Sequence, residues 1–140
     1  MHEVKQVTVK ELREMLVNRQ ALKFIEVLSE VHFKNGHIPG AIDIPLDELN
    51  EVTLTKNKIT KKDTIVVYCN SESCLKSTDA AKKLLEMGYE NAFDFKAGKK
   101  GWEDAGFELD VDWNYINKEL EDAWGYVGMG GRRRAAKLAS

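Results

Sequence analysis

The sequence has few cysteines and prolines and no long apolar run. No stretch approaches the roughly 20 apolar residues of a membrane-spanning helix, and residues 1–5 lack the apolar core of a signal peptide. We therefore expect a cytoplasmic protein with no membrane partner. The formal charge is only −2 over 140 residues, so no global field attracts nucleic acid, and we expect no nucleic-acid partner either.

Cysteine is scarce, and this bounds the chemistry of the chain. Cys69 and Cys74 are too few for a disulfide framework, and they lack the second ligand pair that a zinc site needs. We expect no metal and no other cofactor. Two cysteines only five positions apart in a small chain that we expect in the cytoplasm favour reactive thiols over a structural disulfide.

The composition that is present fits one α/β domain. With 43% hydrophobic residues the chain can bury a core. Short apolar runs at 24–28, 64–68 and 92–95 predict buried strands, and helical patterns lie between them. This order predicts a central, mainly parallel sheet with helices on both faces. Further expected elements are a helix with a capping box formed by Thr8 and Glu11, a short helix at 46–49 and a solvated loop at 55–62.

Cys69 is the residue most indicative of chemistry. It follows the strand predicted at 64–68 and begins a polar loop that leads to a helix with Ala80, Ala81, Leu84 and Leu85 on one face. Parallel sheets bind ligands beyond the carboxyl ends of their strands. Loop N–H groups and the helix dipole favour a thiolate, which predicts a Cys69 pKa below the free value of about 8.5. The alternative is a small buried residue at a strand end.

Three separated motifs resemble those of the rhodanese family, which comprises sulfurtransferases. The first is residues 30–46, centred on Gly36-His37-Ile38-Pro39-Gly40-Ala41; the second is the Cys69 loop; the third is residues 97–106, which contain Gly98, Trp102 and Gly106. The resemblance covers roughly residues 6–110 and implies a single rhodanese-like domain at 1–110.

The resemblance implies a sulfurtransferase that carries sulfane sulfur as a persulfide on Cys69. The sulfur would come from a small donor such as thiosulfate or polysulfide and pass to cyanide, a thiol or a protein. The loop after the cysteine would bind the substrate. Its residues are Asn70, Ser71, Glu72, Ser73, Cys74, Leu75, Lys76 and Ser77.

Some single residues carry two interpretations each. Trp102 resembles the tryptophan near the active-site rim of the family, and a core anchor is the alternative. For His37 a general base is one interpretation, whereas the resemblance implies a structural imidazole bonded to nearby backbone. Cys74 is a possible resolving cysteine for a Cys69 persulfide, or it fills a small apolar niche. Gly98 is expected to be a turn or packing residue.

The loop departs from the commonest family pattern, Cys-Arg-x-Gly-x-Arg-Ser/Thr. The loop is longer and has one cation fewer, and Glu72 adds a negative charge to it. A second departure lies elsewhere in the chain. The D-x-R motif of the family is replaced by Glu26-Val27-Leu28, which leaves a carboxylate without its arginine. Two alternatives to sulfur transfer stay open. A phosphatase or arsenate reductase of this fold needs Cys-x5-Arg, where this chain has Leu75. A non-catalytic interaction module usually lacks the cysteine.

Beyond residue 110 the resemblance ends. Residues 111–127 predict a helical extension with an apolar stripe of Trp113, Ile116, Leu120 and Trp124. We expect this stripe to dock on the chain's own domain, and pairing with a second copy is the alternative, so the oligomeric state stays open. Residues 128–140 predict a flexible basic tail.

Overall fold

The computed structural model describes residues 3–18 and 22–124, and of residues 119–124 it describes the backbone only. A five-stranded sheet with the order β1-β5-β4-β2-β3 forms its centre. All pairs of these strands are parallel. The strands are β1 (Lys5–Gln6), β2 (Leu22–Glu26), β3 (Ile42–Asp43), β4 (Thr64–Tyr68) and β5 (Ala92–Phe95).

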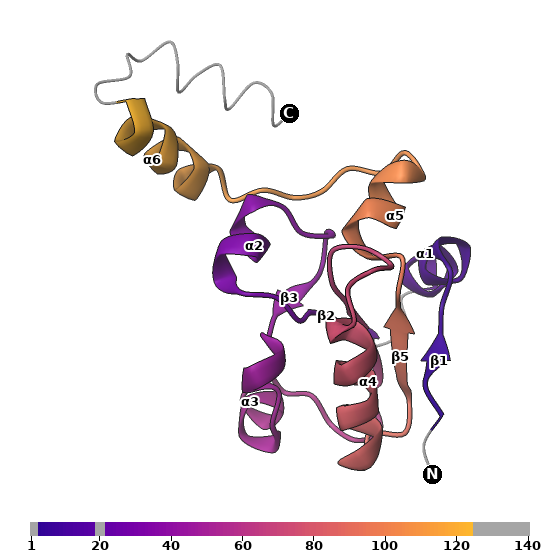
Figure 1. The fold of residues 1–140 in the computed structure, drawn as a ribbon. Coiled ribbons are helices and arrows are strands. Elements are labelled where there is room, and N and C mark those ends of the chain that lie inside the picture. The colour runs from indigo at the N-terminus through magenta and orange to yellow at the C-terminus, as the bar shows by residue number, and fades with distance from the viewer. Residues whose placement is uncertain (1–2, 19–21, 125–140) are drawn as a thin grey trace.

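Helices cover both faces of the sheet (Figure 1). One core cluster lies on the face of α3, η1 and α4, and a second lies on the face of α1 and α5. The expected α/β architecture is therefore confirmed, and the sheet is fully parallel among the described strands. The helices are α1 (Val9–Val17), α2 (Glu30–Asn35), the 3-10 turn η1 (Leu46–Glu48), α3 (Glu51–Lys56), α4 (Lys76–Glu86), α5 (Gly98–Asp104) and α6 (Trp113–Trp124).

β4 is the central strand, and the alternation of its side chains decides which face Cys69 points toward. Ile65 and Val67 point into the cluster under α4, whereas Val66 and Tyr68 point into the other. Because successive side chains of a strand alternate between its faces, the residue after Tyr68 faces α4 again. That residue is Cys69, which is fully buried in the α4 cluster.

Local signals account for several elements. The Thr8 hydroxyl accepts the Glu11 N–H at 3.1 Å, and the Glu11 carboxylate accepts the Thr8 N–H at 2.9 Å, so the predicted capping box is confirmed. Two expectations were wrong in detail: α2 was not expected, and α3 takes up the first part of the loop expected at 55–62. The helix expected at 46–49 is η1.

The C-terminal helix α6 begins against α2. The Asp112 N–H donates to the Lys34 carbonyl at 3.0 Å, and the Lys34 ammonium lies 5.4 Å from the Tyr115 ring centroid. The start of α6 therefore docks on the chain's own domain. The side chains of Leu120 and Trp124, and the tail predicted at 128–140, lie outside the described residues. None of the helices described is long and apolar enough to cross a membrane.

Candidate active site

Cys69 lies at the carboxyl end of β4, with its thiol turned toward the first turn of α4. Its sulfur contacts the Ser77 hydroxyl oxygen at 3.6 Å, and its S–H donates to the Cys74 carbonyl oxygen at 3.5 Å. Ser77 is itself fully buried. The thiol therefore lies in a closed niche between the strand end, the loop and α4.

The pKa of Cys69 moves opposite to the expectation. Burial raises the pKa of the Cys69 thiol, and contact with the Cys74 thiol raises it further, whereas the Ser77 hydroxyl and N–H lower it by less. The physical reason is that desolvation disfavours the thiolate. In addition, the group of Cys74 that faces the Cys69 sulfur is its backbone carbonyl. This carbonyl accepts a hydrogen bond from the thiol and would repel the thiolate. The expectation of a lowered pKa is wrong for this conformation.

The backbone of the cysteine is held by the start of α5. The Lys99 N–H donates to the Cys69 carbonyl at 3.1 Å, and the Lys100 N–H donates to the Asn70 carbonyl at 2.9 Å. Gly98 makes this approach possible, because its φ is +63° and an added Cβ would lie 2.4 Å from the Cys69 carbonyl oxygen. The expected packing role of Gly98 is confirmed.

The loop side chains mostly face solvent. The loop curls through a bond from the Cys74 N–H to the Ser71 carbonyl at 3.0 Å, and the Ser71 and Ser73 hydroxyls lie 3.0 Å apart. Cys74 is partly buried and packs against the α4 core cluster. The exposed loop residues are Asn70, Glu72, Ser73, Leu75 and Lys76.

Two shallow hollows flank the loop. One of about 330 Å³ lies on the α5 side and is lined in part by Glu72, Lys100 and Asp104. The other, of about 630 Å³, lies beyond the ends of β2 and β3 and is lined in part by Val27, Leu46 and Lys76. The second is the more apolar surface near the cysteine, and it lies where parallel sheets bind ligands.

The structure resolves the two interpretations of Trp102 and His37. Trp102 is 3% exposed in the core cluster on the α1 face, and its indole N–H donates to the Glu108 carbonyl at 2.8 Å. It is therefore a core anchor rather than a rim residue. The His37 ring stacks on Phe33 at 3.8 Å between centroids, and its Nδ1 lies 3.0 Å from the Phe33 carbonyl. The structural role expected for His37 is confirmed.

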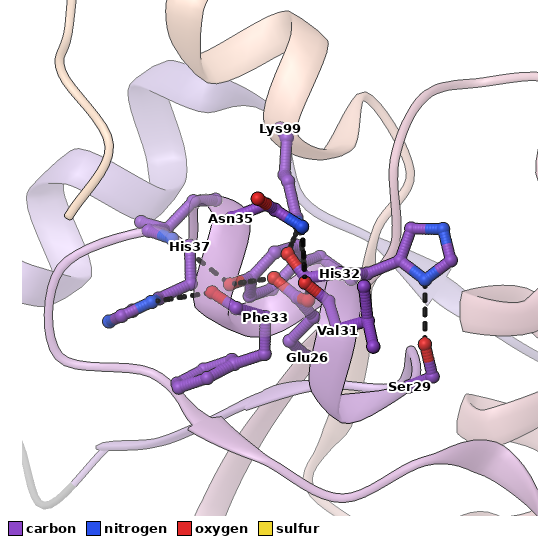
Figure 2. Close-up of polar contacts among 10 residues, drawn as sticks. Glu26, Ser29, Val31, His32, Phe33, Asn35, His37 and Lys99 are labelled. Carbon is purple, nitrogen blue, oxygen red and sulfur yellow. Dashed lines mark hydrogen bonds and ion pairs between the residues drawn. The ribbon is translucent and has the colours of Figure 1, made fainter. Parts of the chain in front are cut away.

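A buried charge network next to the site was missed from the sequence. Lys99 reaches from α5 toward α2 and β2 (Figure 2): its Nζ lies 3.1 Å from Glu26 Oε2 and donates to the His32 carbonyl at 2.9 Å. The Tyr68 hydroxyl donates to Glu26 Oε1 at 2.9 Å and accepts the Ile38 N–H at 3.0 Å. Lys99 thus supplies the cation for a buried carboxylate that has no arginine near it in the sequence.

Two carboxyl groups in this region have altered acidity. Burial raises the pKa of Glu26, and Lys99 and the Tyr68 hydroxyl offset part of that effect. Asp43 is the strand partner of Glu26. Burial and the nearby Glu26 raise the pKa of Asp43 to about 7. Within the described part of the chain, no three His, Cys, Asp or Glu side chains gather in a way that could hold a metal ion.

Comparisons with known proteins identify similar chains. The family model of the rhodanese-like domain matches residues 8–105. The Escherichia coli thiosulfate sulfurtransferase PspE is 40% identical over 76 residues, which are 52% of this chain and 70% of PspE. The mouse thiosulfate sulfurtransferase/rhodanese-like domain-containing protein 3 is 32% identical over 111 residues, with 70% of this chain and 68% of that protein covered.

Solved structures share the fold. A Bacillus halodurans protein superposes with a TM-score of 0.71 at 24% identity, covering 77% of each chain. The human single-domain sulfurtransferase TSTD1 gives a TM-score of 0.61 at 22% identity, covering 73% of this chain and 97% of that one. Among curated relatives, the chain spans only 60% of the Bacillus subtilis protein YqhL and 51% of the putative sulfur carrier protein YrkF from the same organism.

Proposed function

Because the chain belongs to the rhodanese-like domain family, we propose that it is a sulfurtransferase that carries sulfane sulfur as a persulfide on Cys69. The observation that carries this proposal is the position of Cys69, which ends the central parallel strand and directs its sulfur at the first turn of α4. Relatives named as thiosulfate sulfurtransferases support the reaction class.

The proposed reaction has two displacements. The Cys69 thiolate attacks the outer sulfur of the donor, the donor's remainder leaves, and a Cys69–S–S⁻ persulfide forms. A thiophilic acceptor, such as cyanide or a thiol, then attacks the outer sulfur and releases the Cys69 thiolate. The more apolar hollow beside Val27 and Leu46 is the surface on which we place the acceptor.

Loading requires the loop to rearrange. Cys69 is fully buried, so a donor reaches the sulfur only when residues 70–75 move. The Cys74 carbonyl faces the sulfur in the described state, and a persulfide anion there would face a partial negative charge. We expect this carbonyl to turn away on loading, so that loop N–H groups face the anion.

The charges around the loop disfavour a dianionic donor such as thiosulfate. On the α5 side Lys100 is paired with Asp104 at 3.4 Å, and Glu72 lines the same hollow. Lys99 is committed to Glu26 inside the protein. Lys76 is the one cation within the loop residues 70–77.

The test combines intact mass with product assay. Wild type turned over with thiosulfate and cyanide together should form thiocyanate. Cys74→Ala has no second loop thiol to react with the persulfide, so after incubation with donor alone it should gain the mass of one sulfur atom on the Cys69 peptide. Cys69→Ser should form no thiocyanate, and in the Cys74→Ala background it should gain no sulfur, because a hydroxyl near its free pKa is a poor nucleophile. The control Val52→Ala, at a residue 78% exposed on α3, should form thiocyanate like wild type.

Each alternative gives a distinct result in the same experiment. Thiocyanate formation retained by Cys69→Ser would contradict the proposal. Hydrolysis of a phosphate ester by wild type, without any sulfur gain, would instead support the phosphatase interpretation. Neither product from wild type would support the interaction module.

A further inference from the structure

The second cysteine lies beside the first because the loop curls back on itself. The bond from the Cys74 N–H to the Ser71 carbonyl closes a turn, and this turn brings the Cys74 carbonyl oxygen to 3.5 Å from the Cys69 sulfur. Both cysteines are free thiols. Both also contact the α4 core cluster.

We infer that Cys74 is the resolving cysteine of this site: it attacks the Cys69 persulfide, releases sulfide and leaves a Cys69–Cys74 disulfide. This inference rests on the proposed persulfide chemistry of Cys69. It makes the protein a sulfane-sulfur reductase, coupled to a dithiol reductant, in addition to a sulfur carrier.

The backbone geometry brings the bond within reach. A carbonyl oxygen lies about 2.4 Å from its own Cα, so the Cys74 Cα lies within about 6 Å of the Cys69 sulfur. A cysteine sulfur lies about 2.8 Å from its own Cα, so the two Cα atoms lie at most about 9 Å apart. A disulfide joins residues whose Cα atoms are about 4.4–6.8 Å apart, so the bond needs at most a small shift of loop residues 70–75, which move on loading in the proposed reaction. The Cys74 side chain is also one cause of the raised Cys69 pKa, which agrees with this closeness.

The reaction balances without an outside oxidant. The Cys74 thiolate attacks the inner sulfur of Cys69–S–S⁻, the bond between the two persulfide sulfurs breaks, and the outer sulfur leaves as sulfide, which takes up a proton from solvent. The sulfane sulfur gains two electrons and the two cysteine thiols lose two. A dithiol of the thioredoxin class then reduces the disulfide and restores both thiols.

The burial of the site favours the internal thiol over external ones. An acceptor from solution has to enter the niche around Cys69, whereas Cys74 is already partly buried at its edge. Holding two reacting groups together raises their effective concentration by orders of magnitude. In the absence of a strong external acceptor, Cys74 should therefore consume the persulfide.

The experiment is a single turnover of the full chain. Reduced protein receives one equivalent of thiosulfate or of glutathione persulfide, with no added reductant. Wild type should release about one equivalent of sulfide and end with no free thiol, a mass lower by two hydrogens and a Cys69–Cys74 crosslinked peptide. Cys74→Ala and Cys74→Ser should keep the extra sulfur on Cys69 and release at least tenfold less sulfide. Dithiothreitol should return wild type to its starting mass.

A matched control restores the thiol count at the wrong place. Val52→Cys in the Cys74→Ala background adds a thiol on α3, which lies well away from the Cys69 loop (Figure 1), and should not restore sulfide release. If the added Val52→Cys substitution restored sulfide release, the inference would be overturned, because a second thiol anywhere in the chain would then be sufficient. Equal sulfide release by wild type and both Cys74 variants would also overturn it, as would sulfur found on Cys74.

The result also separates this inference from the proposed function. A persulfide on Cys69 that is equally stable in wild type and Cys74→Ala supports the carrier and refutes the resolving role. If no variant gains sulfur from either donor, the proposed function itself is wrong and the resolving role with it. Treatment with diamide then shows independently whether the two thiols can join.

Discussion

Cys69 lies between two regions of opposite character. On one side its backbone is fixed by α5, where Gly98 packs against the Cys69 carbonyl and Lys99 is buried against Glu26. On the other side, residues 70–75 form a loop of mainly exposed side chains held by a turn. The proposed reaction needs this difference, because the backbone of Cys69 has to stay in place while the loop that covers its sulfur moves.

The strongest test of the rigid side is Lys99→Met. This variant leaves the Glu26 carboxylate buried without its cation, so we expect unfolding free energy to fall by about 3–5 kcal/mol. Sulfur transfer should fall as well, because the Lys99 side chain anchors the start of α5, whose N–H groups hold the Cys69 and Asn70 carbonyls. Urea denaturation and a thiocyanate assay measure the two effects.

Two further variants make the Lys99 test specific. Lys100→Met removes the neighbouring lysine, whose pair with Asp104 is exposed, and should change stability by less than about 1 kcal/mol. Glu26→Gln combined with Lys99→Met removes both charges and should recover part of the loss. A Lys99→Met protein as stable as wild type would show that the network contributes no stability.

The second test concerns the close approach at Gly98. Gly98→Ala places a Cβ against the Cys69 carbonyl at a φ that favours glycine, so we expect a loss of about 1–3 kcal/mol. The displaced Cys69 should also react more slowly with its donor. Gly106→Ala is the matched control, because Gly106 also has a positive φ, +92°, but an added Cβ there meets nothing within 4 Å. Equal losses in the two variants would show that backbone strain alone, without the packing, explains the effect.

How far the sequence predicts this arrangement depends on the kind of signal. The apolar run before Cys69 and the helical pattern after it predict β4 and α4, because hydrophobic periodicity is a local property. The pairing of Glu26 with Lys99 joins positions far apart in the chain and leaves no periodic trace. A buried carboxylate without its usual arginine was nevertheless a signal that another cation is required.

The pKa of Cys69 shows a second limit. The expected lowering of the pKa depended on N–H groups that face the sulfur. Burial instead raises the pKa most, and the Cys74 peptide turns its carbonyl toward the sulfur. Residue spacing fixes the length of a loop and leaves such an orientation open. The helix α2 was missed because its residues were interpreted as part of a family motif rather than through their helical pattern.

The reactivity of Cys69 tests the loop of residues 70–75 that covers its sulfur. Because burial and the Cys74 contact raise its pKa, iodoacetamide alkylation of the resting protein should show an apparent pKa above the ordinary thiol value of about 8.5. Alkylation should also be several-fold slower than for an unfolded control peptide, because the closed loop limits access. A midpoint below the ordinary value would mean that the loop is open in solution with its N–H groups turned inward.

The smallest effect we expect is at Asp43, on the rigid side. The raised pKa of Asp43, about 7 against an ordinary 3.8, means that the folded protein keeps this proton over a pH range in which the unfolded chain has lost it. Stability must therefore fall as pH rises from about 4 to about 7 and then level off. Because Asp43 is only partly buried, solvent screening should limit this contribution to about 1 kcal/mol.

Asp43→Asn isolates this contribution. The variant should match wild type near pH 3, where the carboxyl is mostly protonated in both states, and should be more stable than wild type near pH 8. The charged groups that face Asp43 are Glu26, Glu30, Glu48 and Lys99. Burial also raises the pKa of Glu26, so Glu26 contributes a slope of the same sign that the variant keeps. Urea midpoints at several pH values measure the difference. A variant that keeps the full wild-type slope would show that Asp43 ionises freely in the folded protein.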